Sequence, residues 1–152
     1  MGYKNEPKRT LNDMAKAFGE LADYANPHGI KFVIEPITVN QTNYITTTQD
    51  GIKIVERVGR SNFGLMLDVY HMNIEDDDIY NSFRDAGEKC WFVHFTDNNR
   101  KYPGGGHLDF KKIISTLDEI NYNGFVSMEI MPWPDPDTAA RSAIAYLKKI
   151  LT

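Results

Sequence analysis

Four short apolar segments of the sequence each end in a side chain that can bind a metal ion. The terminal residues are Glu35, Asp68, His94 and Glu129, separated by 33, 26 and 35 positions. These intervals are close to the length of one strand followed by one helix, about 30 residues. Because parallel strands in one sheet bring their carboxyl ends to a common edge, we expect the four side chains to lie together. Two glutamates, an aspartate and a histidine form an oxygen-rich set suited to a divalent cation such as Mn²⁺ or Mg²⁺.

The intervening segments predict the elements that position these residues. Continuous or β-branched apolar runs predict buried strands, and apolar residues at three- and four-residue spacing predict helices. The expected strands are 30–34, 63–69, 89–95 and 125–131. Five helices are expected. The first follows a cap at Thr10, the second begins at Thr48 or Asp50, and the third follows the acidic run Glu75–Asp78. The last two span Phe110–Asn121 and Thr138–Leu151. The segment Pro132–Pro136 is too rich in proline for regular structure.

One helix followed by four strand-helix repeats predicts an α/β fold with a parallel sheet. Four such units form half of an eight-stranded (β/α)8 barrel, which usually takes about 250 residues. The simplest alternative is an open four-stranded α/β sheet, which would leave two strand edges unprotected. We therefore expect a half-barrel that another chain, or a second copy, completes.

Composition limits the function classes. At 152 residues, with 41% apolar and 25% charged residues, the chain is typical of one globular domain over 1–152, with a polar leader at 1–9. A net charge of −4 gives no reason to expect nucleic-acid binding. The lone Cys90 is typical of a reducing compartment. No apolar run approaches the ~18 residues of a membrane span, and no signal peptide is evident, so we expect a cytoplasmic protein.

Several motifs around the four residues resemble one family. They are Ile34-Glu35-Pro36, Leu67-Asp68-Val69-Tyr70-His71, His94 to Arg100, Pro103 to Phe110, and Met128-Glu129. This set resembles the sugar isomerase/epimerase group of xylose-isomerase-like TIM barrels, which includes the ketose 3-epimerases and hydroxypyruvate isomerases. The likeness runs from about residue 10 to 151 but covers only the C-terminal half of the family's fold, strands five to eight.

The resemblance implies a role for each residue. Glu35, Asp68, His94 and Glu129 match the ligands of one divalent metal ion, most commonly Mn²⁺ or Mg²⁺, with Co²⁺ or Zn²⁺ as alternatives. The two glutamates match the catalytic pair that exchanges a proton at the carbon beside a sugar carbonyl. A metal that bridges the carbonyl and hydroxyl oxygens would stabilise the resulting enediolate.

Three further residues are implied in binding the sugar. His71 and Arg100 match the family's substrate-binding pair, and both could hold oxygen atoms of the substrate. His107 could point into the site from the glycine-rich loop Pro103–Gly106, or cap the helix that begins near Asp109. That loop also suggests phosphate binding, although without a following lysine and hydroxyl residue, flexibility is the simpler interpretation.

Gln41 departs from the family pattern. Ketose 3-epimerases of this group carry a second glutamate near the substrate, six residues after the first metal ligand. An amide cannot act as a base, so Gln41 would either bind a hydroxyl group or be an ordinary loop residue.

Two other functions have to be weighed. Zinc-dependent apurinic-site endonucleases share the superfamily, but they use three zinc ions and need further histidine and aspartate ligands that the segment after His94 lacks. A truncated or split, non-catalytic half-barrel is the second alternative. It would need a homodimer partner or an N-terminal half-barrel partner to form a sugar pocket.

Overall fold

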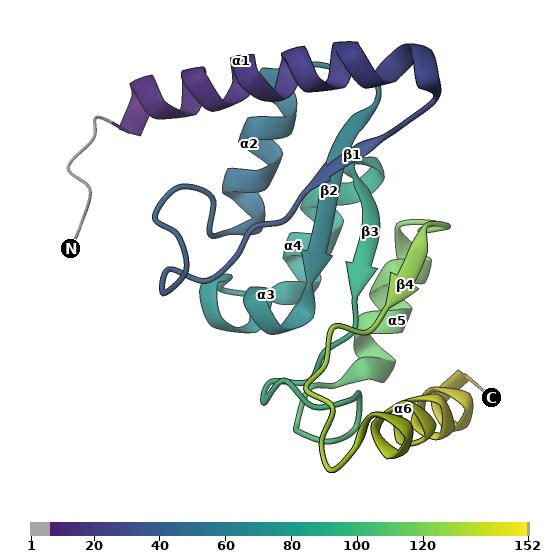
Figure 1. Ribbon diagram of the computed structural model, residues 1–152. Coiled ribbons are helices and arrows are strands. Elements are labelled where there is room, and N and C mark those ends of the chain that lie inside the picture. The colour runs from purple at the N-terminus through teal and green to yellow at the C-terminus, as the bar shows by residue number, and fades with distance from the viewer. Residues whose placement is uncertain (1–6, 152) are drawn as a thin grey trace.

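Four parallel strands form a sheet in the order β1-β2-β3-β4, so each strand pairs with the next one along the chain (Figure 1). The computed structural model describes residues 7–151. Its elements in chain order are α1 (Pro7–Ala25), η1 (Asn26–His28), β1 (Phe32–Ile34), α2 (Thr48–Val58), β2 (Phe63–Asp68), α3 (Val69–Glu75), α4 (Ile79–Ala86), η2 (Gly87–Lys89), β3 (Cys90–His94), α5 (Phe110–Glu119), β4 (Phe125–Ser127) and α6 (Pro136–Leu151). This parallel α/β arrangement confirms the expected half-barrel topology.

The principal helices begin and end where side chains satisfy their terminal backbone groups. The Thr47 side chain accepts a hydrogen bond from the Asp50 amide at the start of α2. The Asp78 side chain accepts hydrogen bonds from two backbone amides at the start of α4. The Asp109 side chain accepts one, from the Lys112 amide, at the start of α5. Gly59 ends α2 in a left-handed conformation (φ 60°) that suits glycine.

Alternate strand residues separate two faces of the sheet. The side chains of Phe63, Leu65 and Leu67 point to one face and lie in the core, packed with the helices. This core is continuous from α1 through α2 and α4 to α5, because apolar helix residues such as Ile54, Phe83 and Ile113 are fully or almost fully buried. Burial of this face fixes which residues point the other way.

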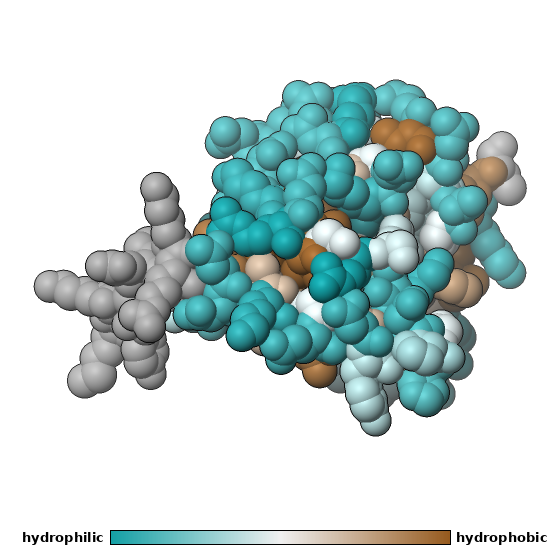
Figure 2. Space-filling view, turned by 90° about the horizontal axis from the view of Figure 1, so that it is seen from above, coloured by the Kyte–Doolittle hydropathy of each residue, from teal (hydrophilic) through white to brown (hydrophobic). Residues whose placement is uncertain are grey.

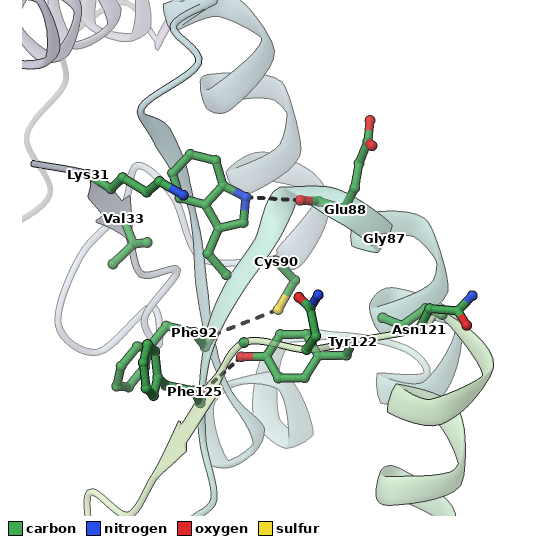
Figure 3. A pocket seen from close by; sticks show the side chains of 13 residues that line it. Lys31, Val33, Gly87, Glu88, Cys90, Phe92, Asn121, Tyr122 and Phe125 are labelled. Carbon is green, nitrogen blue, oxygen red and sulfur yellow. Dashed lines mark hydrogen bonds between the residues drawn. The ribbon is translucent and has the colours of Figure 1, made fainter. Parts of the chain in front are cut away.

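The opposite, inner face carries an apolar layer that is largely open. Val33, Met66, Phe92 and Phe125 lie outside the buried core, and Phe125 is 78% exposed. The rings of Phe92 and Phe125 lie 6.4 Å apart and line a cavity of about 710 Å³ (Figure 3). Trp91 also lines this cavity, and its ring lies over Gly64, where a Cβ atom would collide with it.

Four sequence expectations need correction. Helix α1 begins at Pro7, so Thr10 lies inside the helix and not at its start; residues 1–6 of the expected polar leader lie outside the described part. A further helix, α3, follows β2 without a break. Strand β4 ends at Ser127, which leaves Glu129 two residues beyond it. Helix α6 begins at Pro136, because proline is tolerated in a first helical turn.

The outer surface is mostly polar where Figure 2 shows it, with hydrophilic side chains around α1 and apolar ones in separate small areas. Over residues 7–151 no helix combines the length and the apolar character that crossing a lipid bilayer requires.

Candidate metal centre

The four sequence-predicted ligands meet at the carboxyl edge of the sheet. Glu35 directly follows β1, Asp68 and His94 are the last residues of β2 and β3, and Glu129 follows β4. One ligand atom from each residue lies within 4.8 Å of those of the others. The pairing of Asp68 with His94 across β2 and β3 sets the centre of this group. Among the described residues, no other set of three or more histidine, cysteine or acidic side chains comes together in this way.

The polar atoms in the group match what a cation would need. His94 Nδ1 lies 3.6 Å from Glu35 Oε1 and 3.7 Å from Glu129 Oε2. It lies 4.0 Å from Asp68 Oδ2. Both His94 Nδ1 and Glu35 Oε1 are buried and have no hydrogen-bond partner within the described chain. Buried polar atoms are normally paired, so this constellation fits a divalent cation with nitrogen and oxygen ligands.

Electrostatics in the group follow from burial. Desolvation, reinforced by the charges of Asp68 and Glu129, raises the pKa of Glu35 from 4.5 to about 7. Burial also raises the pKa of Asp68, against the opposing effects of the Tyr70 amide and Arg100. Like charges this close are stable together only if protons or cations neutralise part of the charge.

Arg100 supplies one positive charge to this carboxylate group. Its guanidinium lies 2.5 Å from Asp68 Oδ2 and 3.1 Å from Glu129 Oε2. The same group stacks over the Tyr70 ring, 4.3 Å from its centroid, and lies 2.9 Å from His71 Nε2. The structure therefore places Arg100 beside the predicted ligands, and the substrate-binding role that the family resemblance implies for it stays a prediction.

His71 is buried beside Arg100, and a donor group faces each of its two ring nitrogens. The Thr38 amide donates to His71 Nδ1 at 3.2 Å, so in the neutral ring the proton belongs on Nε2. Burial and the nearby Arg100 charge lower the pKa of His71 to about 4. Nε2–H and the Arg100 guanidinium are both donors, and they face each other. An acceptor oxygen within hydrogen-bond distance of both nitrogen atoms, to one side of the line that joins them, would satisfy both groups.

The remaining sequence-predicted residues lie further out. His107 is exposed on the glycine-rich loop; its backbone amide donates to Asn98, and the described contacts include none between its ring and the four clustered side chains. A role for His107 in substrate binding stays a prediction. Gln41 is exposed in the turn that follows Thr38, consistent with an ordinary loop residue.

Sequence reasoning missed two residues that shape the centre. Tyr70 supports the Arg100 guanidinium, and Asp97 is fully buried behind the glycine-rich loop. The loop is held by the Asp97 carboxylate, so it is neither free nor open to a phosphate. The available signal was an acidic residue directly after Phe95-Thr96, just beyond the strand, and seven residues before the first of three glycines.

Known proteins resemble this chain over most of its length. Residues 1–150 match the family described as Xylose isomerase-like TIM barrel. The chain is 35% identical to the ketose 3-epimerase of Arthrobacter globiformis, covering 93% of this chain and 55% of that protein. The crystal structure of D-psicose 3-epimerase with D-tagatose from Clostridium cellulolyticum H10 superposes with a TM-score of 0.90 at 29% identity, over 99% of this chain and 60% of that one.

A second similar structure, of the IolI protein with a binding zinc atom, gives a TM-score of 0.83 at 25% identity, over 99% of this chain and 59% of that one. The chain spans about half the length of the curated relatives it matches.

Proposed function

The chain belongs to the xylose isomerase-like TIM barrel family, and we propose that its four clustered ligands hold one divalent metal ion in a sugar isomerase or epimerase site. Its four-stranded sheet is the C-terminal half of that barrel, strands five to eight. The observation that carries the proposal is the convergence of Glu35, Asp68, His94 and Glu129 with two unpaired buried atoms among them.

The proposed reaction is proton transfer at the carbon beside a sugar carbonyl. A bound divalent ion would lower the energy of negative charge on the carbonyl and neighbouring hydroxyl oxygens. Glu35 and Glu129 are the proposed proton-transfer groups, because they are the two carboxylates at opposite strands of the sheet. If one removes the proton and the other returns it to the opposite face, the carbon is epimerised.

His71 and Arg100 are the proposed substrate-binding pair. His71 Nε2–H and the guanidinium form two donors that face one another beside the carboxylates. A sugar oxygen within hydrogen-bond distance of both nitrogen atoms would accept from both, which would fix the orientation of the reacting carbon relative to Glu129. Arg100 would also stabilise negative charge that develops on that oxygen.

We propose a small ketose or related hydroxy-ketone as the substrate class. Relatives named as ketose, D-psicose and L-ribulose 3-epimerases support a ketose. The relative named 3-dehydro-D-guloside 4-epimerase shows that the reacting carbon differs within the group. Position 41 carries glutamine, which cannot act as a base, so the proposed reaction does not use a carboxylate at that position.

A complete sugar pocket needs a cover over the inner face of the sheet. Phe125 and Val33 are exposed on the inner face of the sheet, and within residues 7–151 no further strand pairs with the edge strands β1 and β4. We propose that further parallel strands cover this face, from a second copy or from an N-terminal half-barrel partner. A non-catalytic half-barrel is the corresponding alternative where no such strands are supplied.

The test combines assembly, metal and chemistry. The mass of the chain in solution and its bound Mn²⁺ would be measured first, and then exchange of the proton beside the carbonyl in D-fructose, D-psicose and L-ribulose in deuterated water. Glu129→Gln should abolish the exchange and leave the free energy of unfolding within about 0.5 kcal/mol, since this side chain is 55% exposed. Glu20→Gln, the same change on the exposed face of α1, is the control.

The proposal fails if a monomer binds no divalent ion, or if Glu129→Gln exchanges the substrate proton as fast as the control variant. Binding of three metal ions per chain would instead favour the endonuclease alternative.

A further inference from the structure

Asp97 is a fully buried carboxylate whose hydrogen-bond partners are all backbone amides. Its Oδ2 accepts from Gly104 at 3.0 Å and from Gly106 at 2.8 Å. Its Oδ1 accepts from Asn98 at 2.9 Å and from Leu108 at 3.2 Å. Four converging amides form the kind of concave anion site that binds phosphate in other proteins. Here the anion is a side chain of the same loop.

Two glycines of the loop lie where a side chain would have no room. A Cβ atom on Gly106 would collide with the side chains of Asp97 and Asn98. Gly104 adopts a φ of 86° and lies against the Tyr146 ring, where a Cβ atom would also collide. The loop therefore closes on Asp97 from one side and on α6 from the other.

The backbone of Asp97 also holds the turn that carries Arg100. The Arg100 amide donates to Asp97 O at 2.9 Å, and the Asp97 amide donates to Lys101 O at 3.0 Å. Within this turn Arg100 has a φ of 61°, a left-handed conformation that is uncommon for a residue with a side chain. The Met131 amide donates to Arg100 O at 2.7 Å and attaches the turn to the segment after β4.

We propose that Asp97 is a positioning residue: its carboxylate locks the loop of residues 98–108 and thereby holds Arg100 in the left-handed conformation that directs the guanidinium to Asp68, Glu129 and His71. Asp97 does not touch the substrate and acts through Arg100. For its effect on substrate binding, this inference rests on the proposed sugar site. Its effect on the loop and on the Arg100 side chain does not.

The test variant is Asp97→Asn, which keeps the size of the side chain. The amide group replaces one acceptor oxygen with a donor, so in either orientation two of the four loop amides lose their acceptor. Asp109→Asn is the matched control, because Asp109 is exposed in the same segment and asparagine serves equally well as a helix cap. Both variants remove one negative charge.

Three measurements decide the role. Hydrogen exchange at the Gly104, Gly106 and Leu108 amides should become about tenfold faster in Asp97→Asn. The side-chain NMR signal of Arg100 Nε should change to that of a freely rotating guanidinium. The KM for the sugar should rise about tenfold with a smaller change in kcat, and Asp97→Asn should add less than about twofold once Arg100→Ala is present. Asp109→Asn should leave all three unchanged.

The role of Asp97 is overturned if the loop amides exchange faster while the Arg100 signal stays as in the control, because Asp97 would then hold the loop alone. If the unaltered chain, together with the strands that complete its pocket, turns over no sugar, the proposed function fails, and the amide and Arg100 signals still test the positioning. If Asp97→Asn does not fold, Gly106→Ala displaces the same carboxylate, and the same three signals decide.

Discussion

Replacement of Glu35 by glutamine should make the metal-free chain more stable at alkaline pH while it removes metal binding. The pKa of Glu35 is raised from 4.5 to about 7, first by burial and then by the charges of Asp68 and Glu129. Ionised Glu35 is therefore unfavourable in the folded state. At about 1.4 kcal/mol for each tenfold change in proton affinity, this amounts to ~3 kcal/mol. Because the side chain is 20% exposed, we expect about 2 kcal/mol.

The sign follows from the direction of this pKa change. The folded chain binds the Glu35 proton more tightly than the unfolded chain, so its stability is greatest below the unfolded pKa of 4.5 and falls as pH rises to about 7. At pH 4.5 both forms of the chain carry a neutral group at position 35 when folded, and Glu35→Gln should change stability little. At pH 8 only the glutamine variant avoids the buried charge.

The assay is urea unfolding in the presence of a chelator at pH 4.5 and pH 8, repeated with Mn²⁺. With the chelator at pH 8, Glu35→Gln should be about 2 kcal/mol more stable than the unaltered chain. With Mn²⁺ the order should reverse, because only the unaltered chain gains the free energy of metal binding. Glu20→Gln, on the exposed face of α1, should change neither result.

Two outcomes would refute this reasoning. If Glu35→Gln is less stable than the unaltered chain at pH 8 without metal, ionised Glu35 does not destabilise the folded state. If Mn²⁺ stabilises both forms equally, Glu35 is not a ligand.

The remaining predictions concern the scaffold. Gly64→Ala should reduce the free energy of unfolding by about 1–3 kcal/mol, because the added methyl group collides with the Trp91 ring, and Trp91 fluorescence should shift with it. Thr47→Ala should cost about 1 kcal/mol in urea unfolding through loss of the α2 cap, and Thr47→Ser, which keeps the hydroxyl, should restore most of it. A Gly64→Ala chain as stable as the original would show that the ring moves aside freely.

Most of the fold was predictable from local patterns. The runs that became β2 and β3 are apolar and bounded by turn residues, and α2, α4 and α5 carry apolar residues at helical spacing. Helix α3 was not predictable in this way, because Val69 continues the apolar run of β2 without a break. The Asp68 side chain ends the strand by accepting a hydrogen bond from the Tyr70 amide, which is a local contact with no periodic signature.

The candidate site divides along a similar line. Glu35, Asp68, His94 and Glu129 were predictable as a group because parallel strands force their carboxyl ends to one edge. Asp97 and Tyr70 were not, because the loop after β3 has no repeating geometry from which a direction could be derived. Their roles depend on where Arg100 lies.

Strand alternation and strand-helix spacing are properties of the chain, so the residue pattern is enough to tell which side chains reach the edge of the sheet. The electrostatic state of these side chains depends on the folded molecule. Burial raises the pKa of Glu35 and lowers that of His71. The Asp97 carboxylate holds the loop that contains Arg100 by accepting from backbone amides as far as Leu108, eleven residues along the chain, and these amides converge only when the loop is folded. Such effects depend on distances in space and not on spacing along the chain, so no pattern in the sequence contains them.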